Sequence, residues 1–101
     1  MLNVAKLVEN TVKYLRGEGI YVLECRIKEK ATKFEINMKL DKNPAGLSYV
    51  KIQISKDGKK IRVFTRRTSF DLRIKRFIRR ELEKMAGYFE TTSQEEDTGS
   101  S

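Results

Sequence analysis

The sequence contains no histidine and no tryptophan, and it has one cysteine and one proline among its 101 residues. Without histidine, the chain lacks the usual general base near neutral pH, the commonest metal ligand and the group that activates a serine or cysteine nucleophile. The single Cys25 cannot form an internal disulfide, which argues against a secreted, disulfide-stapled scaffold. Because Cys25 stands between Leu23 and Ile27 on the apolar side of an expected strand, we expect its thiol to be buried.

Long apolar runs and phosphate-binding glycine loops are also missing. No run approaches the length of a bilayer-spanning helix, and no basic-then-apolar leader opens the chain. Gly17 and Gly19 follow an expected helix, whereas a dinucleotide-binding fingerprint needs its glycines after a strand. The carboxylates are scattered, and most stand beside Lys or Arg. We therefore expect an intracellular, cytoplasmic protein that is not an enzyme and that uses no metal and no other cofactor.

Positive charge is what the sequence has in excess. The chain has 22 Lys and Arg residues against 14 Asp and Glu residues, a formal charge of +8. Three of the acids, Glu95, Glu96 and Asp97, lie in the polar segment 91–101, so residues 1–90 are still more basic. Such a surplus attracts polyanions through a field that needs no base-specific contact. The alternatives are another acidic partner, a membrane surface, or solubility alone. Abundant Lys, Arg, Glu and Ile with little Gln is also typical of thermophiles.

Two segments have helical periodicity. In residues 3–16 apolar side chains recur every three or four positions, and Gly17 ends the segment. The second segment starts near Thr68, with Asp71 as the partner in a capping box, and runs to about Phe89. Its apolar residues fill one arc, and its cations fill the opposite arc.

Four segments between the helices alternate apolar and polar residues as half-buried strands do. These segments are 20–28, 33–40, 49–55 and 60–66. Short polar links predict hairpins between the first two strands and, at Asp57-Gly58, between the last two. The sequence thus predicts one α+β domain over residues 1–90, a two-layer sandwich with both helices on one face of a four-stranded antiparallel sheet, followed by a disordered acidic tail at 91–101.

The first candidate binding surface is the sheet face that the helices leave open. Tyr49, Lys51, Arg62 and Phe64 point outward there. An aromatic ring between Arg62 and Arg66 is what a base-stacking platform needs, because rings stack on unpaired bases while cations meet phosphates. The alternative is that Phe64 packs beneath arginine side chains or in a dimer contact.

The second candidate surface is the polar side of the last helix. Its cations are Arg73, Lys75, Arg76, Arg79, Arg80 and Lys84, and Arg66 and Arg67 precede them. Such a stripe suits phosphate contacts, although a solvated helix face would have the same pattern. Leu72 lies among these cations, either as a partner contact or as one of the isolated apolar residues that most surfaces carry.

The order helix, strands, helix resembles that of double-stranded-RNA-binding domains and of the Alu-RNA-binding proteins of the signal recognition particle. The resemblance is in element order only, since the chain lacks the alanine-rich, Lys-Lys-led final helix of the former and the diagnostic motifs of the latter. It implies helices on one side of an antiparallel sheet.

The sequence predicts a non-catalytic protein that binds nucleic acid, with RNA or single strands favoured over base-specific duplex DNA. The predicted contact residues are Tyr49, Lys51, Arg62, Phe64, Arg66, Arg67, Arg73, Arg76, Arg79 and Arg80. The alternative is a protein-interaction or assembly subunit, or a homodimer with no nucleic-acid role, in which Phe64, Tyr49 and Leu72 form the interface.

Overall fold

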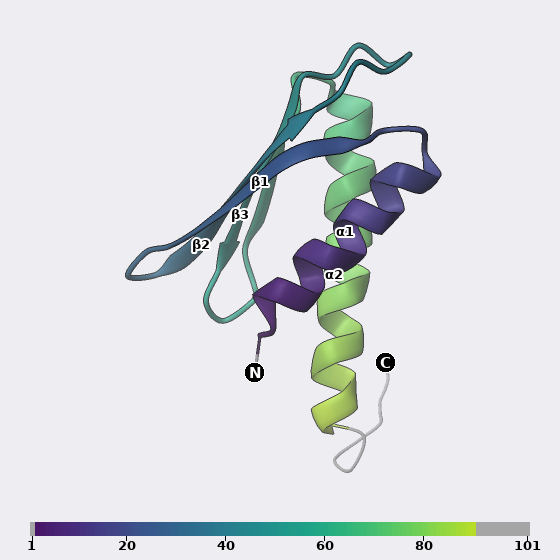
Figure 1. Cartoon of the computed structure of the whole chain (residues 1–101). Helices are drawn as coiled ribbons and strands as arrows, with labels where there is room; N and C mark the ends of the chain where they lie inside the picture. Colours follow the sequence, from purple (N-terminus) through teal and green to yellow (C-terminus); the bar gives the residue numbers. More distant parts are fainter. Residues whose placement is uncertain (1, 91–101) are drawn as a thin grey trace.

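The computed structural model describes residues 2–90, with side chains to Met85. The elements in chain order are α1 (Val4–Gly17), β1 (Val22–Glu29), β2 (Lys33–Leu40), β3 (Tyr49–Ser55), β4 (Ile61–Phe64) and α2 (Thr68–Glu90). Both helices lie on one side of a four-stranded antiparallel sheet and contact each other (Figure 1). The predicted α+β fold is confirmed; the tail predicted at 91–101 lies outside the described residues.

The sheet has the order β1-β2-β3-β4, so each strand pairs with its neighbour in sequence and β1 and β4 are the two edges. The turn between β3 and β4 is the predicted Asp-Gly turn. Gly58 takes a positive φ of 75°, which glycine adopts without steric cost. The Asp57 carboxylate accepts hydrogen bonds from Ser55 Oγ (2.6 Å) and Lys59 N (2.9 Å). Both bonds favour the charged carboxylate and lower the pKa of Asp57.

The core lies between the sheet and the helices. Alternate residues of β2, β3 and β4 point into it, as their period of two predicts. Its most buried apolar side chains are Leu7, Leu15, Ile20, Ile36, Met38, Val50, Ile52, Ile54, Ile74 and Ile78. Neither helix within residues 2–90 combines the length and hydropathy that crossing a bilayer requires.

Three contacts set α2 against α1. The rings of Tyr14 and Phe77 stack with centroids 4.4 Å apart. Asn10 Nδ2 donates to Glu81 Oε1 at 2.8 Å. Arg73 Nη1 lies 3.0 Å from Glu18 Oε1, which joins the far end of α1 to the start of α2. These contacts fix which arc of α2 faces solvent.

Cys25 is exposed, so the expectation of a buried thiol is wrong. Cys25 pairs with Met38, and Ile27 pairs with Ile36, so both face the helical side of the sheet as the alternation predicts. Their partners Met38 and Ile36 on β2 are buried, so the helices cover the sheet at this level but leave its edge strand β1 open. The tip of the β1–β2 hairpin also projects beyond α1 (Figure 1). Partial burial still raises the pKa of the Cys25 thiol, which keeps it protonated near neutral pH.

Candidate nucleic-acid interface

The sheet face opposite the helices is polar and carries the first predicted surface. Directly opposed residues share a face, so the strand register gives its side-chain rows. From β2 to β4 these rows are Lys33–Ser55, Glu35–Gln53–Arg62, Asn37–Lys51–Phe64 and Lys39–Tyr49. β1 adds Lys28 beside Glu35, Arg26 beside Asn37 and Glu24 beside Lys39. Phe64 is 41% exposed and lies opposite Lys51, so an accessible ring has a cation as its cross-strand neighbour.

A hollow of about 660 Å³ opens on this face near the tips of the hairpins. Its walls include Lys33 from β2, Lys60 just before β4, and Arg62 within β4, with Gln53 and Ser55 between them. Among the described side chains, no carboxylate lies within ion-pair distance of Lys60 or Arg62. The hollow therefore presents two unpaired cations, Lys60 and Arg62, which suit phosphate oxygens. Its Lys33 is paired with Glu35, its Ser55 hydroxyl donates to Asp57, and the Asp57 carboxylate is part of its lining.

Glu35 is an acid that lies among these cations on β2. It is only 8% exposed although it lies on the open face. Lys30 Nζ lies 3.4 Å and Lys33 Nζ 3.7 Å from its Oε2, and Gln53 Nε2 donates to the same oxygen at 3.3 Å. Burial raises the pKa of Glu35, but the hydrogen bond from Lys30 and the charges of the neighbouring lysines outweigh it, so the net pKa is below the ordinary value.

Acid is expected to destabilise the protein partly through Glu35. Because its pKa is lower in the folded chain than in the unfolded chain, ionised Glu35 stabilises the fold fully above the unfolded pKa of about 4.3. That contribution is lost as the pH falls through the lower folded value. Urea denaturation between about pH 6 and pH 2.5 should show a shallower acid-side loss for Glu35→Gln than for the wild type. If the free energy of unfolding of Glu35→Gln fell as steeply with pH as that of the wild type, this assignment would be contradicted. Some dependence on pH should remain in both proteins, because the pKa of Asp57 is also lowered in the folded chain.

The solvent side of α2 carries the second predicted surface. Arg76, Arg79 and Arg80 are exposed, and Lys75 is half-buried beside β4. Arg73 is engaged, because its guanidinium pairs with Glu18 and lies 4.5 Å from the centroid of the Phe70 ring. Arg73 therefore holds α2 against α1, and its predicted contact role would require breaking that ion pair.

The two surfaces meet at the β4 edge of the sheet. A shallow groove there is lined by Arg62 and Phe64 from β4 and by Leu72 and Lys75 from α2. Leu72 is 52% exposed, so the groove carries accessible apolar side chains on both walls and cations beside them. The two candidate surfaces therefore meet at this groove, which also contains Asp71. We use the name β4 wrap for the basic, aromatic and aliphatic residues of the groove together with basic neighbours on β3, on β4 and its flanking turns, and on α2: Lys51, Lys60, Arg62, Phe64, Arg66, Arg67, Leu72, Lys75, Arg76 and Arg79.

A network around Thr65 fixes the turn from β4 into α2. The buried Thr65 hydroxyl donates to Asp71 Oδ1 at 2.6 Å and accepts from Arg67 N at 3.1 Å. Asp71 thus bonds to Thr65, where the sequence predicted a capping box with Thr68. Arg66 takes a φ of 73°, a left-handed conformation that costs a non-glycine residue about 1–2 kcal/mol. This strained and exposed arginine stands in the turn that joins β4 to α2.

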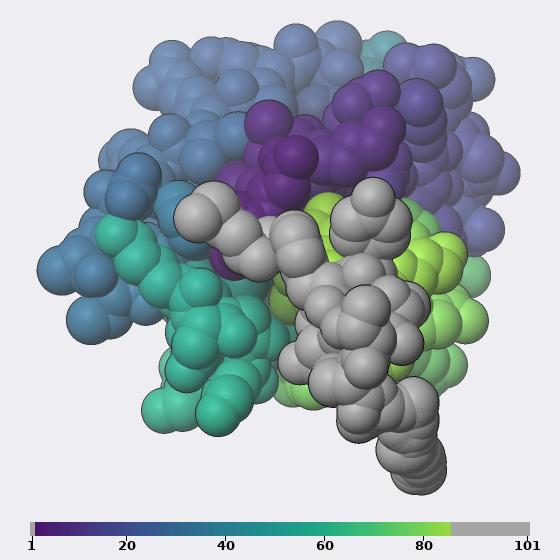
Figure 2. Space-filling model, turned by 90° about the horizontal axis from the view of Figure 1, so that it is seen from below, coloured from purple at the N-terminus to yellow at the C-terminus, as the bar shows by residue number. Residues whose placement is uncertain are grey.

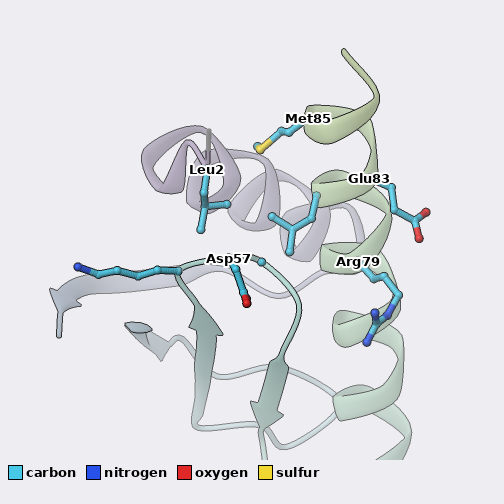
Figure 3. Close-up of a pocket in the computed structure, with 8 residues that line it drawn as sticks. Leu2, Asp57, Arg79, Glu83 and Met85 are labelled. Atoms are coloured by element: carbon cyan, nitrogen blue, oxygen red, sulfur yellow. The ribbon is translucent and has the colours of Figure 1, made fainter. Parts of the chain in front are cut away.

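A second pocket, of about 430 Å³, lies at the end of the molecule viewed in Figure 2, where the N-terminal segment, the β3–β4 turn and α2 meet. Leu2, Leu82 and Met85 give it an apolar lining, and Glu83 points away from it (Figure 3). Its Asp57 carboxylate already accepts two hydrogen bonds. Among the described residues, no three His, Cys, Asp or Glu side chains form a group that could hold a metal ion.

Comparison with protein-family models, with curated proteins and with solved structures finds no match to this chain. The interpretation of the surface therefore depends on its own residues. The structure places Tyr49, Lys51, Arg62 and Phe64 on one face, and Leu72 and Lys75 of α2 line the adjoining groove. Arg66 and Arg67 lie in the connection from β4 to α2, and Arg76 and Arg79 follow Leu72 and Lys75 along the same side of α2. The predicted contact residues omitted Lys33, Lys60 and Lys75. The strand and helix periodicities predict that these three side chains point outward. That they lie near Arg62 depends on the strand register and on how α2 packs against the sheet.

Proposed function

We propose that this protein binds single-stranded nucleic acid, with RNA favoured, across the β4 wrap. The observation that carries the proposal is the continuity of exposed aromatic, aliphatic and cationic side chains from Phe64, around the β4 edge, to Leu72 and Lys75. A stack of unpaired bases needs an accessible ring, and its phosphates need cations on either side of that ring. The β4 wrap has this order, with Arg62 and Lys51 beside Phe64 and Lys75 across the groove.

Single strands fit this surface better than duplexes. The bases of a duplex present only their edges, whereas the exposed Phe64 ring can stack only on an unpaired base. The open face has one exposed ring, Phe64, and one half-buried ring, Tyr49, among the described residues, which gives little basis for reading a sequence. Stacking tolerates every base because each has a π-face. We therefore expect weak base preference and an affinity dominated by phosphate contacts.

Arg66 provides a test in which stability and affinity move in opposite directions. Arg66→Gly should relieve the left-handed strain and raise the free energy of unfolding by up to about 1 kcal/mol, after allowance for the greater freedom of glycine in the unfolded chain. The same change should weaken RNA binding roughly 5- to 10-fold at about 50 mM salt, because one phosphate contact is lost. Urea denaturation and fluorescence anisotropy with a labelled single-stranded RNA measure the two effects.

The matched control is Arg66→Lys, which keeps both the charge and the strain and should leave stability and affinity close to the wild type. A more stable Arg66→Gly protein that binds RNA with wild-type affinity would remove Arg66 from the interface. A less stable one would contradict the assigned strain.

A further inference from the structure

β1 is the other edge of the sheet, and it is uncovered on both faces. Seven of its eight residues are exposed, whereas buried and partly exposed residues alternate along β3. Tyr21, Leu23 and Ile27 are 53%, 60% and 46% exposed, and they make up most of the large exposed hydrophobic residues among the described part of the chain. These residues and Cys25 give β1 an apolar surface that its own helices leave open.

The backbone of β1 is also available. Lys30 N donates to Lys33 O at 2.8 Å, which marks that pair as hydrogen-bonded. In an antiparallel ladder, hydrogen-bonded and non-hydrogen-bonded pairs alternate, so Lys28 and Arg26 also bond to β2. Cys25 and Ile27 then direct their N–H and C=O groups to the free edge, to which no strand within residues 2–90 pairs. A long edge with apolar side chains is a template for another strand.

We propose that β1 pairs antiparallel with β1 of a second copy of this chain, forming a symmetric dimer. A two-fold axis perpendicular to the sheet requires the residue at the axis to face its own copy. With Cys25 at the axis, Glu24 faces Arg26 of the second copy, and Leu23 faces Ile27 of the second copy. Both kinds of pair occur twice, once on each side of the axis. Because side chains alternate along a strand, the opposite charges pair on one face of the sheet and the apolar side chains pair on the other.

Neighbouring registers lack this complementarity. An axis at Arg26 would place the two Arg26 side chains opposite each other, and an axis at Ile27 would place Arg26 opposite Lys28 of the second copy. Like charges directly opposed destabilise an antiparallel pair. Within one chain, Arg26 Nη2 already lies 3.0 Å from Glu24 Oε2. In the Cys25-centred dimer these two residues and their copies would therefore form a four-membered network of alternating charge.

The strand irregularity between Val22 and Glu24 sits at the end of this contact. It confines the regular ladder of the dimer to residues 24–26, so the Leu23–Ile27 contacts must come from side chains. Ile27 lies in the regular part of β1, so it is the better of the two apolar partners to substitute, and by symmetry its substitution removes both Leu23–Ile27 contacts of the dimer. The axis also places both open sheet faces on the same side of one eight-stranded sheet.

The test is the oligomeric state, measured by analytical ultracentrifugation in reducing buffer without nucleic acid. The wild type should be a dimer at micromolar concentrations. Ile27→Lys should raise the dimer dissociation constant by about 100-fold or more, because two apolar contacts are replaced by buried ammonium groups. The control Leu72→Lys, which changes a similarly exposed apolar residue on α2, should remain dimeric. A monomeric wild type, or a dimer that Ile27→Lys leaves intact, would overturn the proposal.

Cys25 reports the register. Opposed Cα atoms of a hydrogen-bonded antiparallel pair are about 5.5 Å apart, within the range a disulfide spans. Mild oxidation, or a short bis-thiol reagent, should therefore link two wild-type chains covalently, and Cys25→Ser should prevent the link without dissociating the dimer. A dimer that does not link through Cys25 would contradict the register. The proposal stands apart from nucleic-acid binding, since Ile27→Lys should still bind a short RNA with wild-type affinity per chain.

Discussion

Phe64→Ala is expected to weaken binding of a single-stranded RNA by about 5- to 150-fold, the equivalent of one base stack worth about 1–3 kcal/mol. Phe64 is 41% exposed beside Lys51, so its ring can stack a base while the neighbouring cations hold the flanking phosphates. Because no charge is removed, the dependence of affinity on salt should not change. Fluorescence anisotropy at three or more salt concentrations measures both quantities.

Arg62→Gln is the matched comparison, one position along the same surface. It should lower the slope of log affinity against log salt by about 0.7, because one phosphate contact with a single strand is lost. Phe64→Trp keeps an aromatic face and should bind at least as well as the wild type. Wild-type affinity in Phe64→Ala would exclude stacking and leave Phe64 with a packing role only.

Ile78→Ala is expected to lower the free energy of unfolding by about 2–5 kcal/mol, a large share of the 5–15 kcal/mol that domains of this size possess. The Ile78 side chain is fully buried, on the arc of α2 that faces the sheet. Truncation removes its burial and leaves a cavity between the two layers. The melting temperature should fall by roughly 10–30 °C, measured by circular dichroism.

Leu72→Ala is the control for this change. Leu72 lies on the same helix but is 52% exposed, so its truncation should change the free energy of unfolding by no more than about 0.5 kcal/mol. If Leu72→Ala destabilised the protein as much as Ile78→Ala, α2 would be seated on the sheet by a different arc, and the β4 wrap would not exist as described.

The elements that the sequence predicted best have one buried face. Residues 33–40 and 49–55 alternate strictly, and β2 and β3 begin and end at those residues. A register slip of one residue would turn every apolar side chain of such a strand to solvent, so its pattern is decisive. The helix over 68–89 was predictable for a similar reason. Its apolar and basic residues occupy opposite arcs, so only the apolar arc can pack against the sheet.

Coverage by the helices was not predictable from the pattern. Alternation correctly placed Cys25 and Ile27 on the helical side, but whether a helix reaches an edge strand depends on helix length and crossing direction. The burial of Glu35 was not predictable either, because alternation places it on the polar face of its strand. Its burial arises from Lys30, Lys33 and Gln53, which converge on it from the hairpin and the neighbouring strand.

The sequence predicted the two sets of residues of the candidate site. It did not predict that the two sets meet at the β4 edge of the sheet. Outward positions on β4 and polar positions on α2 follow from the two periodicities. Their junction depends on the Thr65–Asp71 hydrogen bond and on the left-handed Arg66, which together turn the chain from β4 into α2. The left-handed conformation of Arg66 could not be predicted from the local sequence, because glycine or asparagine usually occupies that conformation.

The most direct measurement is a titration of labelled single-stranded RNA, single-stranded DNA and duplex RNA against the wild-type protein from about 50 to 400 mM salt. Four or five cations of the β4 wrap on a single strand predict a log–log slope of about −3, with micromolar or tighter binding at the lowest salt. Single strands should bind more tightly than the duplex, because only they present a free base face to Phe64. Absence of single-strand binding at about 50 mM salt, or an affinity that salt does not change, would contradict the proposed function.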